Sequence, residues 1–86
     1  MMTFATNGVR PMPKTTKEWE DQAKGLLKAE LKRRNVTYAQ LCGALADIGV
    51  MDSEPNIRNK LSRGKFTAVF MLQCLRAIRA ETLRLD

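Results

Sequence analysis

The chain has 86 residues, of which 44% are hydrophobic, so it can form one domain with a small core and is unsuited to wholesale disorder. Its formal net charge is +6, and a basic excess on so short a chain suits an anionic partner, nucleic acid before a membrane surface. Because it has no run of about 18 apolar residues and no signal peptide, we expect a cytoplasmic protein that makes no use of a membrane.

The first residues of the chain predict an arm rather than a helix. Residues 1–14 hold an Asn-Gly pair and two prolines, and their few apolar residues have no helical period. We therefore expect a flexible arm at residues 1–14 and one domain at residues 15–86. Arg10 and Lys14 leave two interpretations of this arm open: a contact with a DNA backbone or minor groove, or a tail with no role.

A first helix is expected to begin near Thr16, with Thr15 or Thr16 as its N-cap and carboxylates in or near its first turn. Apolar residues at steps of three and four form one stripe along it: Trp19, Ala23, Leu26, Leu27 and Leu31. After a basic last turn, Asn35 is the expected stop.

A second helix is predicted by the capping-box spacing of Thr37 and Gln40, and Gly49 suits its C-terminal end. Its inward face is expected to hold Leu41, Ala44, Leu45 and Ile48. Gly43 lies inside this helix, where glycine is unfavourable, and we interpret it as the mark of a close approach to the first or third helix.

Ser53 is the expected N-cap of a third helix that ends at Gly64. Thr67 opens a fourth helix, whose pattern continues toward Leu83. Its expected inward residues are Phe70, Met71, Cys74, Leu75 and Ile78. Short helices with one apolar stripe each and tight connections predict an all-α fold, a small orthogonal bundle of four helices, with a fifth left open.

The inventory of reactive residues argues against an enzyme. The chain has no histidine, no glycine-rich phosphate loop and no cluster of metal ligands, so we expect no catalytic residue, cofactor, metal or small-molecule ligand. Cys42 and Cys74 lie in apolar helical patterns without the spacing of a metal or redox motif. Parity allows one disulfide, but two reduced core thiols are the preferred interpretation for a cytosolic protein.

The third helix, residues 53–64, has the clearest functional pattern. At 100° per residue, four polar side chains fall within an arc of about 100° that excludes Ile57 and Leu61. The four are Asn56, Asn59, Lys60 and Arg63. Asparagine pairs with adenine and arginine with guanine in the major groove, so we predict that these residues read bases. An ordinary solvated face is the alternative, for which asparagine is a poor choice because its helix propensity is low.

Other residues around this helix are predicted to hold DNA phosphates. The Ser53 hydroxyl and the N–H groups beside it suit an anion, and Lys65 follows the helix directly. The cations at the basic end of the first helix would add further phosphate contacts if this end reaches the same side of the fold. The predicted backbone contacts are Ser53, Arg58, Lys65, Arg33 and Arg34.

The stretch Leu27–Ile78 resembles XRE-type helix-turn-helix regulators, the Cro and phage-repressor proteins. The matching residues are Val36-Thr-Tyr-Ala-Gln-Leu41 and the run from Ser53-Glu-Pro-Asn-Ile57 through Arg63-Gly-Lys65. The resemblance implies a bacterial or phage transcription regulator that binds double-stranded DNA at the nucleoid. The chain is several residues longer than these regulators between Leu41 and Ser53, which lengthens the turn. Over most of its length it resembles more closely a group of short bacterial proteins known as a domain of unknown function, which implies no activity.

Apolar residues outside the core stripe leave a second kind of partner open. Val69, Leu72 and Arg76 form another stripe on the fourth helix, and Leu83 follows it. A homodimer through helix 67–83, using Val69, Leu72 and Leu83, would set the spacing of DNA half-sites near 34 Å. The alternative function is a helical adaptor, antitoxin-like or phage-derived, that binds a protein and no DNA. RNA is less favoured because only 6% of the residues are aromatic.

Overall fold

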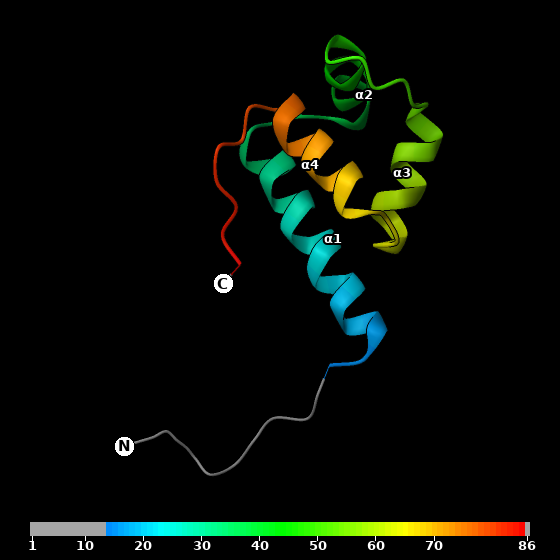
Figure 1. Cartoon of the computed structure of the whole chain (residues 1–86), viewed down its shortest axis with the longest axis vertical. Helices are drawn as coiled ribbons and strands as arrows, with labels where there is room; N and C mark the ends of the chain where they lie inside the picture. Colours follow the sequence, from blue (N-terminus) through cyan, green and yellow to red (C-terminus); the bar gives the residue numbers. More distant parts are fainter. Residues whose placement is uncertain (1–13, 86) are drawn as a thin grey trace.

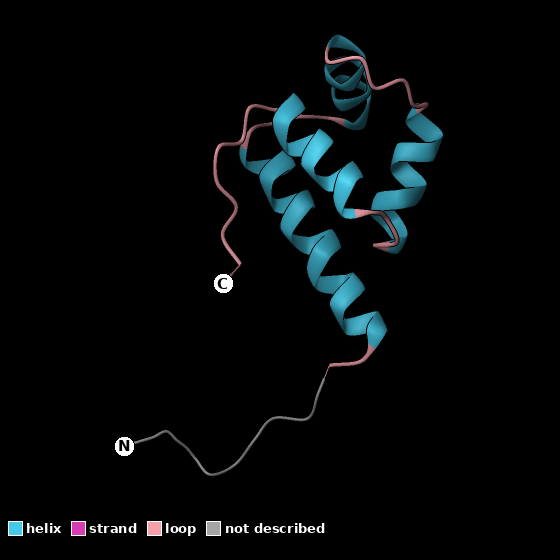
Figure 2. Cartoon of the chain, viewed as in Figure 1, coloured by secondary structure: helices cyan, strands magenta, loops and turns pink. Residues whose placement is uncertain are grey.

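The computed structural model describes residues 14–85, which form four helices joined by loops (Figures 1 and 2). The helices are α1 (Thr16–Arg33), α2 (Tyr38–Asp47), α3 (Glu54–Arg63) and α4 (Ala68–Ala77), and residues 14–85 contain no strand. The predicted all-α bundle of four helices is therefore confirmed. Of the predicted arm, only Lys14 lies within the described residues. None of the four helices has the length and apolar character that crossing a membrane requires.

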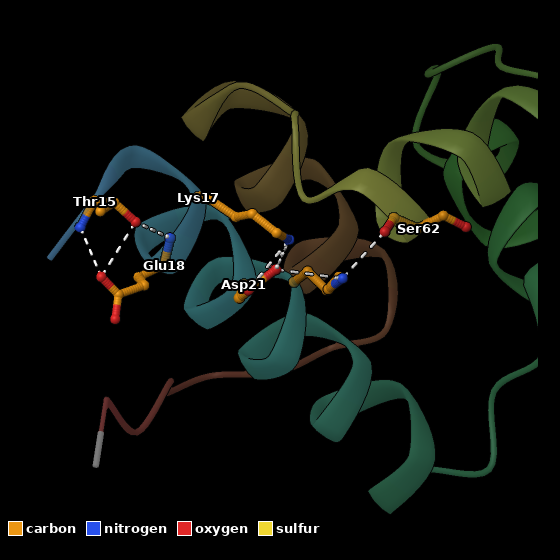
Figure 3. Close-up of polar contacts among 6 residues, drawn as sticks. Thr15, Lys17, Glu18, Asp21 and Ser62 are labelled. Atoms are coloured by element: carbon orange, nitrogen blue, oxygen red, sulfur yellow. Dashed lines mark hydrogen bonds and ion pairs between the residues drawn. The ribbon is translucent and has the colours of Figure 1, made fainter.

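Each helix begins at a hydroxyl side chain that accepts a hydrogen bond from the backbone N–H three residues later. These N-caps are Thr15, Thr37, Ser53 and Thr67. In α1 a capping box is completed by Glu18, whose Oε1 accepts a hydrogen bond from the Thr15 backbone N–H at 2.8 Å (Figure 3). In α2 the Gln40 side chain accepts from the Thr37 N–H at 2.9 Å. The helix starts predicted from the sequence are confirmed.

Three helices end in the same backbone motif, in which one residue takes a positive φ and the next donates to a carbonyl five residues earlier. The positive φ belongs to Asn35 after α1 (57°), Gly49 after α2 (84°) and Arg79 after α4 (61°). The returning bonds reach the carbonyls of Leu31, Leu45 and Leu75, at 2.9, 2.8 and 2.8 Å. Asn35 and Gly49 were expected stops, and both are confirmed.

The expected continuation of the fourth helix toward Leu83 is wrong. The helix ends at Ala77 because Arg79 adopts the left-handed conformation and the Ala80 N–H returns to the Leu75 carbonyl. Unlike glycine or asparagine, an arginine in this position gives no sequence signal for a stop. The chain then runs back beside α1 (Figure 1), where the Gln22 side chain donates to the carbonyl of Leu85 at 3.5 Å.

The core lies between the four helices and is built from their apolar stripes. Its buried residues are Leu27, Leu31, Leu41, Leu45, Ile57, Leu61, Phe70, Cys74, Leu75 and Ile78. Two expected inward residues are exposed instead, and Ala23, Leu26 and Ala44 are only half-buried. Trp19 is 57% exposed because the N-terminal end of α1 extends past the other helices (Figure 1). Ile48 is also exposed, since α2 has already ended when the chain reaches it.

The C-terminal end of α3 rests directly on the backbone of α1. Gly64 is buried there with φ 69°, and a Cβ on it would lie 2.3 Å from the carbonyl oxygen of Glu20. One turn further along α1, the Lys24 ammonium donates to the carbonyl of Ser62 at 3.2 Å (Figure 3). The position of α3 is therefore fixed at its C-terminal end by a contact that only a glycine permits.

The expected close approach at Gly43 is wrong, because a Cβ built on this exposed residue would have no atom within 4 Å. We therefore expect Gly43→Ala to raise the free energy of unfolding by about 0.5–1 kcal/mol, since alanine loses less conformational entropy in a helix. Urea denaturation followed by circular dichroism measures this change. A variant less stable than the wild type would show that α2 is packed more closely than described.

Candidate nucleic-acid interface

α3 forms one flank of the bundle (Figure 1) and buries only one side of its surface. Ile57 and Leu61 are fully buried, whereas Asn56, Asn59 and Arg63 are exposed on the other side. Positions spaced by three and four residues share a helix face, and seven residues span about 10 Å along the axis. Within residues 14–85, the side chains of Asn59 and Arg63 make no hydrogen bond or ion pair. The outer face of α3, Asn56, Asn59 and Arg63, thus presents amide and guanidinium groups to solvent, although the Asn56 side chain also hydrogen-bonds Asp52.

Lys60, the fourth residue predicted for this face, is held by other residues of the protein, although its side chain is 39% exposed. Its ammonium lies 2.7 Å from Asp52 Oδ2 and 4.4 Å from the centre of the Phe70 ring. It stands at the edge of the predicted arc nearest the core, within reach of both an aromatic face and a carboxylate. Because an ammonium bound in this way has little freedom to reach a base, Lys60 is a structural residue beside the face rather than part of it.

Asp52 is the residue that fixes the long connection between α2 and α3, residues 48–53. Its carboxylate accepts from Lys60 and from the Ser53 backbone N–H at 2.9 Å, and its carbonyl accepts from the Cys42 thiol at 3.1 Å. The hydrogen bond from Lys60 is the main cause that lowers the pKa of Asp52, against the opposing effect of burial. The carboxylate therefore stays ionised at neutral pH and ties the turn to both α2 and α3.

Sequence reasoning missed Asp52 altogether. The residue lies eight positions before Lys60 and outside any helix, so neither helical spacing nor a capping pattern pairs the two. Only the path of the turn brings the carboxylate to the lysine. The side chain of Asp52 is only 11% exposed, so the carboxylate of the pair is largely buried, whereas the Lys60 side chain is 39% exposed.

Two of the predicted phosphate contacts lie at the start of α3, each with a partner in the protein. The Ser53 hydroxyl accepts from the Asn56 N–H at 3.2 Å. The Arg58 guanidinium lies 2.7 Å from Glu54 Oε2 and stands over the Tyr38 ring at 5.5 Å. Both residues remain exposed. A surface ion pair of this kind contributes only about 0–1 kcal/mol, so an arriving phosphate can replace Glu54 at small cost.

A basic groove adjoins the start of α3. It has a volume of about 490 Å³ and runs between the end of α1, the start of α2 and the first turns of α3. Its cations are Lys28, Lys32 and Arg58, and Tyr38 and Val36 give it an apolar part. Among the residues that the structure describes, neither Lys28 nor Lys32 has an ion-pair partner. The sequence pointed to the basic end of α1, where both lysines lie, and named Lys32 as a possible contact; it did not single out Lys28.

Arg33 and Arg34, the residues predicted from that end of α1, do not line this groove. Both pair with the buried carboxylate of Glu30, Arg33 through Nη1 and Arg34 through Nε at 3.6 Å. Successive residues of a helix turn by 100°, so Arg33 points away from the side on which Lys28 and Lys32 lie. The expectation that Arg33 and Arg34 hold DNA phosphates stays a prediction, but they lie outside the groove beside α3. Lys65, after the C-terminal end of α3, is exposed and makes no ion pair within residues 14–85.

The remaining reactive residues belong to the core and not to this interface. Cys42 and Cys74 are both free thiols, so the disulfide that parity allowed is not formed. Cys74 is fully buried on α4, and its burial raises the pKa of the thiol to about 12. In the described part of the chain, no group of three or more histidine, cysteine or acidic residues is arranged to hold a metal ion.

Comparison with known proteins gives one match. Residues 19–83 match the model of a domain of unknown function (DUF6471), and because the match covers most of the chain, the chain belongs to this family. No curated protein and no solved structure matches it. The expected relation to a group known as a domain of unknown function is confirmed.

Proposed function

We propose that the chain binds double-stranded DNA sequence-specifically, with α3 in the major groove, and acts as a small transcriptional regulator of XRE type at the nucleoid. The observation that carries this proposal is the outer face of α3, which displays two amides and one guanidinium above a fully buried aliphatic side. Such a helix is anchored by its own core residues, so its polar face is available to a partner.

The spacing of this face suits consecutive base pairs. Asn56, Asn59 and Arg63 span about 10 Å along the axis, which corresponds to three steps of about 3.4 Å along a DNA strand. An asparagine amide both donates to N7 and accepts from N6 of adenine, and an arginine donates twice to guanine. We therefore expect a half-site that contains a guanine opposite Arg63 and an adenine opposite one of the asparagines.

Cations at both ends of α3 support the same geometry. The basic groove with Lys28, Lys32 and Arg58 adjoins the first turns of the helix, and Lys65 follows its last turn. A helix lying in the major groove has a phosphate strand on each side, so cations at its two ends favour contacts with both strands. The net charge of +6 acts in the same direction by attracting DNA from a distance.

Selection of bound sequences from a random duplex library, followed by titration of the selected site, tests the proposal. We expect Arg63→Ala and Asn59→Ala each to weaken binding to the selected site by about 1–3 kcal/mol and to relax the preference at one base pair. Lys32→Ala is expected to weaken binding to all sequences alike and to reduce the slope of log K against log salt by about one.

Lys17→Ala is the matched control, because Lys17 lies at the opposite end of α1 and pairs with Asp21 at 3.3 Å. It should leave both the affinity and the salt slope close to those of the wild type. Equal losses on selected and random DNA for Arg63→Ala, Asn59→Ala and Lys32→Ala would reject base reading by α3. No binding to any duplex at low salt would reject DNA as the partner and favour the adaptor function.

A further inference from the structure

The side of α4 that faces away from the core carries exposed apolar residues beside a hollow. Val69 and Leu72 are 62% and 66% exposed on this side. The hollow, of about 440 Å³, lies between α4 and the C-terminal segment, residues 80–85. Its apolar lining comes from Leu72, Leu75, Ala80 and Leu83, and Arg76 and Glu81 stand at it as its charged residues. An apolar knob, formed by Val69 and Leu72, therefore lies next to an apolar hollow on one surface.

We propose that a second copy of this chain binds here, in a two-fold symmetric dimer. In such a dimer the same surface is used by both copies, so each knob meets the partner's hollow. Val69 and Leu72 of one copy enter the hollow of the other, and the reverse contact is made by symmetry. The pairing removes four exposed aliphatic side chains from water.

The charges beside the hollow favour a second copy over a different partner. Arg76 and Glu81 are both exposed, and neither has an ion-pair partner among residues 14–85. A two-fold axis near Leu72 brings Arg76 of one copy opposite the partner's Glu81, and Glu81 opposite the partner's Arg76. One cation and one anion on the same small surface are both matched by an identical surface, whereas a partner of a single charge matches only one of them.

This geometry differs from the homodimer expected through a helix at 67–83. Leu83 does not continue the stripe of Val69 and Leu72, because α4 ends at Ala77. It lies instead on the C-terminal segment, partly buried against the core, and forms one wall of the hollow. The dimer surface is thus made of a helix and the segment that folds back beside it. It shares no residue with the outer face of α3, so the dimer does not depend on the proposed DNA binding.

Sedimentation velocity of the full chain over a concentration series, without DNA, tests this inference. The wild type is expected to pass from monomer to dimer at concentrations below about 200 µM. Leu72→Glu should raise the dissociation constant of the dimer at least about tenfold, because it brings two carboxylates into apolar hollows. Met51→Glu is the matched control, since Met51 is also exposed but lies in the connection between α2 and α3, and it should leave the constant unchanged.

A charge exchange separates this dimer from other modes of association. Arg76→Glu and Glu81→Arg should each weaken the dimer about tenfold, because each places like charges opposite one another. The double variant R76E/E81R restores both pairs and should recover most of the affinity. A wild type that stays monomeric, a Leu72→Glu variant that dimerises normally, or a double variant no better than the single ones would each overturn the proposal. Circular dichroism of every variant confirms that the monomer is folded.

Discussion

Replacing Gly64 by alanine is expected to destabilise the domain by about 2–5 kcal/mol, from a strained backbone and an overpacked contact together. The residue has φ 69°, a conformation that alanine adopts only with strain. An added Cβ would also lie 2.3 Å from the carbonyl oxygen and 2.9 Å from the carbonyl carbon of Glu20. These are backbone atoms within a helix, so relief requires that α1 and α3 move apart.

Chemical denaturation of Gly64→Ala measures this effect, and Gly49→Ala is its control. Gly49 also has a positive φ, 84°, but a Cβ there has no atom within 4 Å, so only the backbone strain of about 1 kcal/mol is expected. The difference between the two variants isolates the contact with α1. If both lose the same stability, α3 is not held against the Glu20 backbone.

The second large effect concerns the buried thiol of Cys74 at high pH. Burial raises its pKa from the usual 9.0 to about 12 in the folded protein. A group with a raised folded pKa contributes full stability below its unfolded pKa and loses it as the pH rises toward the folded value. The contribution of Cys74 should therefore decline between pH 9 and 12. Near pH 10.5 the loss amounts to about 2 kcal/mol, at about 1.4 kcal/mol per pH unit.

Unfolding free energies of the wild type and Cys74→Ala, measured in reducing buffer from about pH 8 to 10.5, test this expectation. Every other ionisable group is the same in both proteins, so the difference between the two isolates the thiol. Cys42→Ala serves as the matched variant, because Cys42 is the other free thiol and is only half-buried. A difference between the wild type and Cys74→Ala that is independent of pH would show that water reaches the thiol in the folded state.

The Gly64 contact bears on the proposed DNA interface because it helps to place α3. Gly64 holds the C-terminal end of this helix against α1, and Asp52 ties the turn before the helix to Lys60 in its last turn, beside Phe70. The outer face of α3 is therefore presented in one orientation by these contacts. A face with fixed orientation loses less conformational entropy when a partner binds it than a mobile one does.

Most helix boundaries and most of the core were determined by the sequence itself. N-caps, the stops at Asn35 and Gly49 and the aliphatic stripes are local patterns, in which residues a few positions apart act through one helix. The amphipathic character of α3 is also a local pattern, since the buried positions of Ile57 and Leu61 follow from the helical period of 3.6 residues. These features need no knowledge of the neighbouring helices.

The tertiary structure alone decided which cations stand beside α3. Lys60 pairs with Asp52, and Arg33 and Arg34 pair with Glu30, whereas Lys28 and Lys32 reach the groove at the start of α3. It also decided that Gly64 meets the backbone of α1, that Gly43 lies in open space, and that Arg79 ends α4. The physical reason is the same in each case: a side chain's role depends on what the path of the chain brings within a few ångströms, and turns and helix packing set that path rather than the period of any single helix.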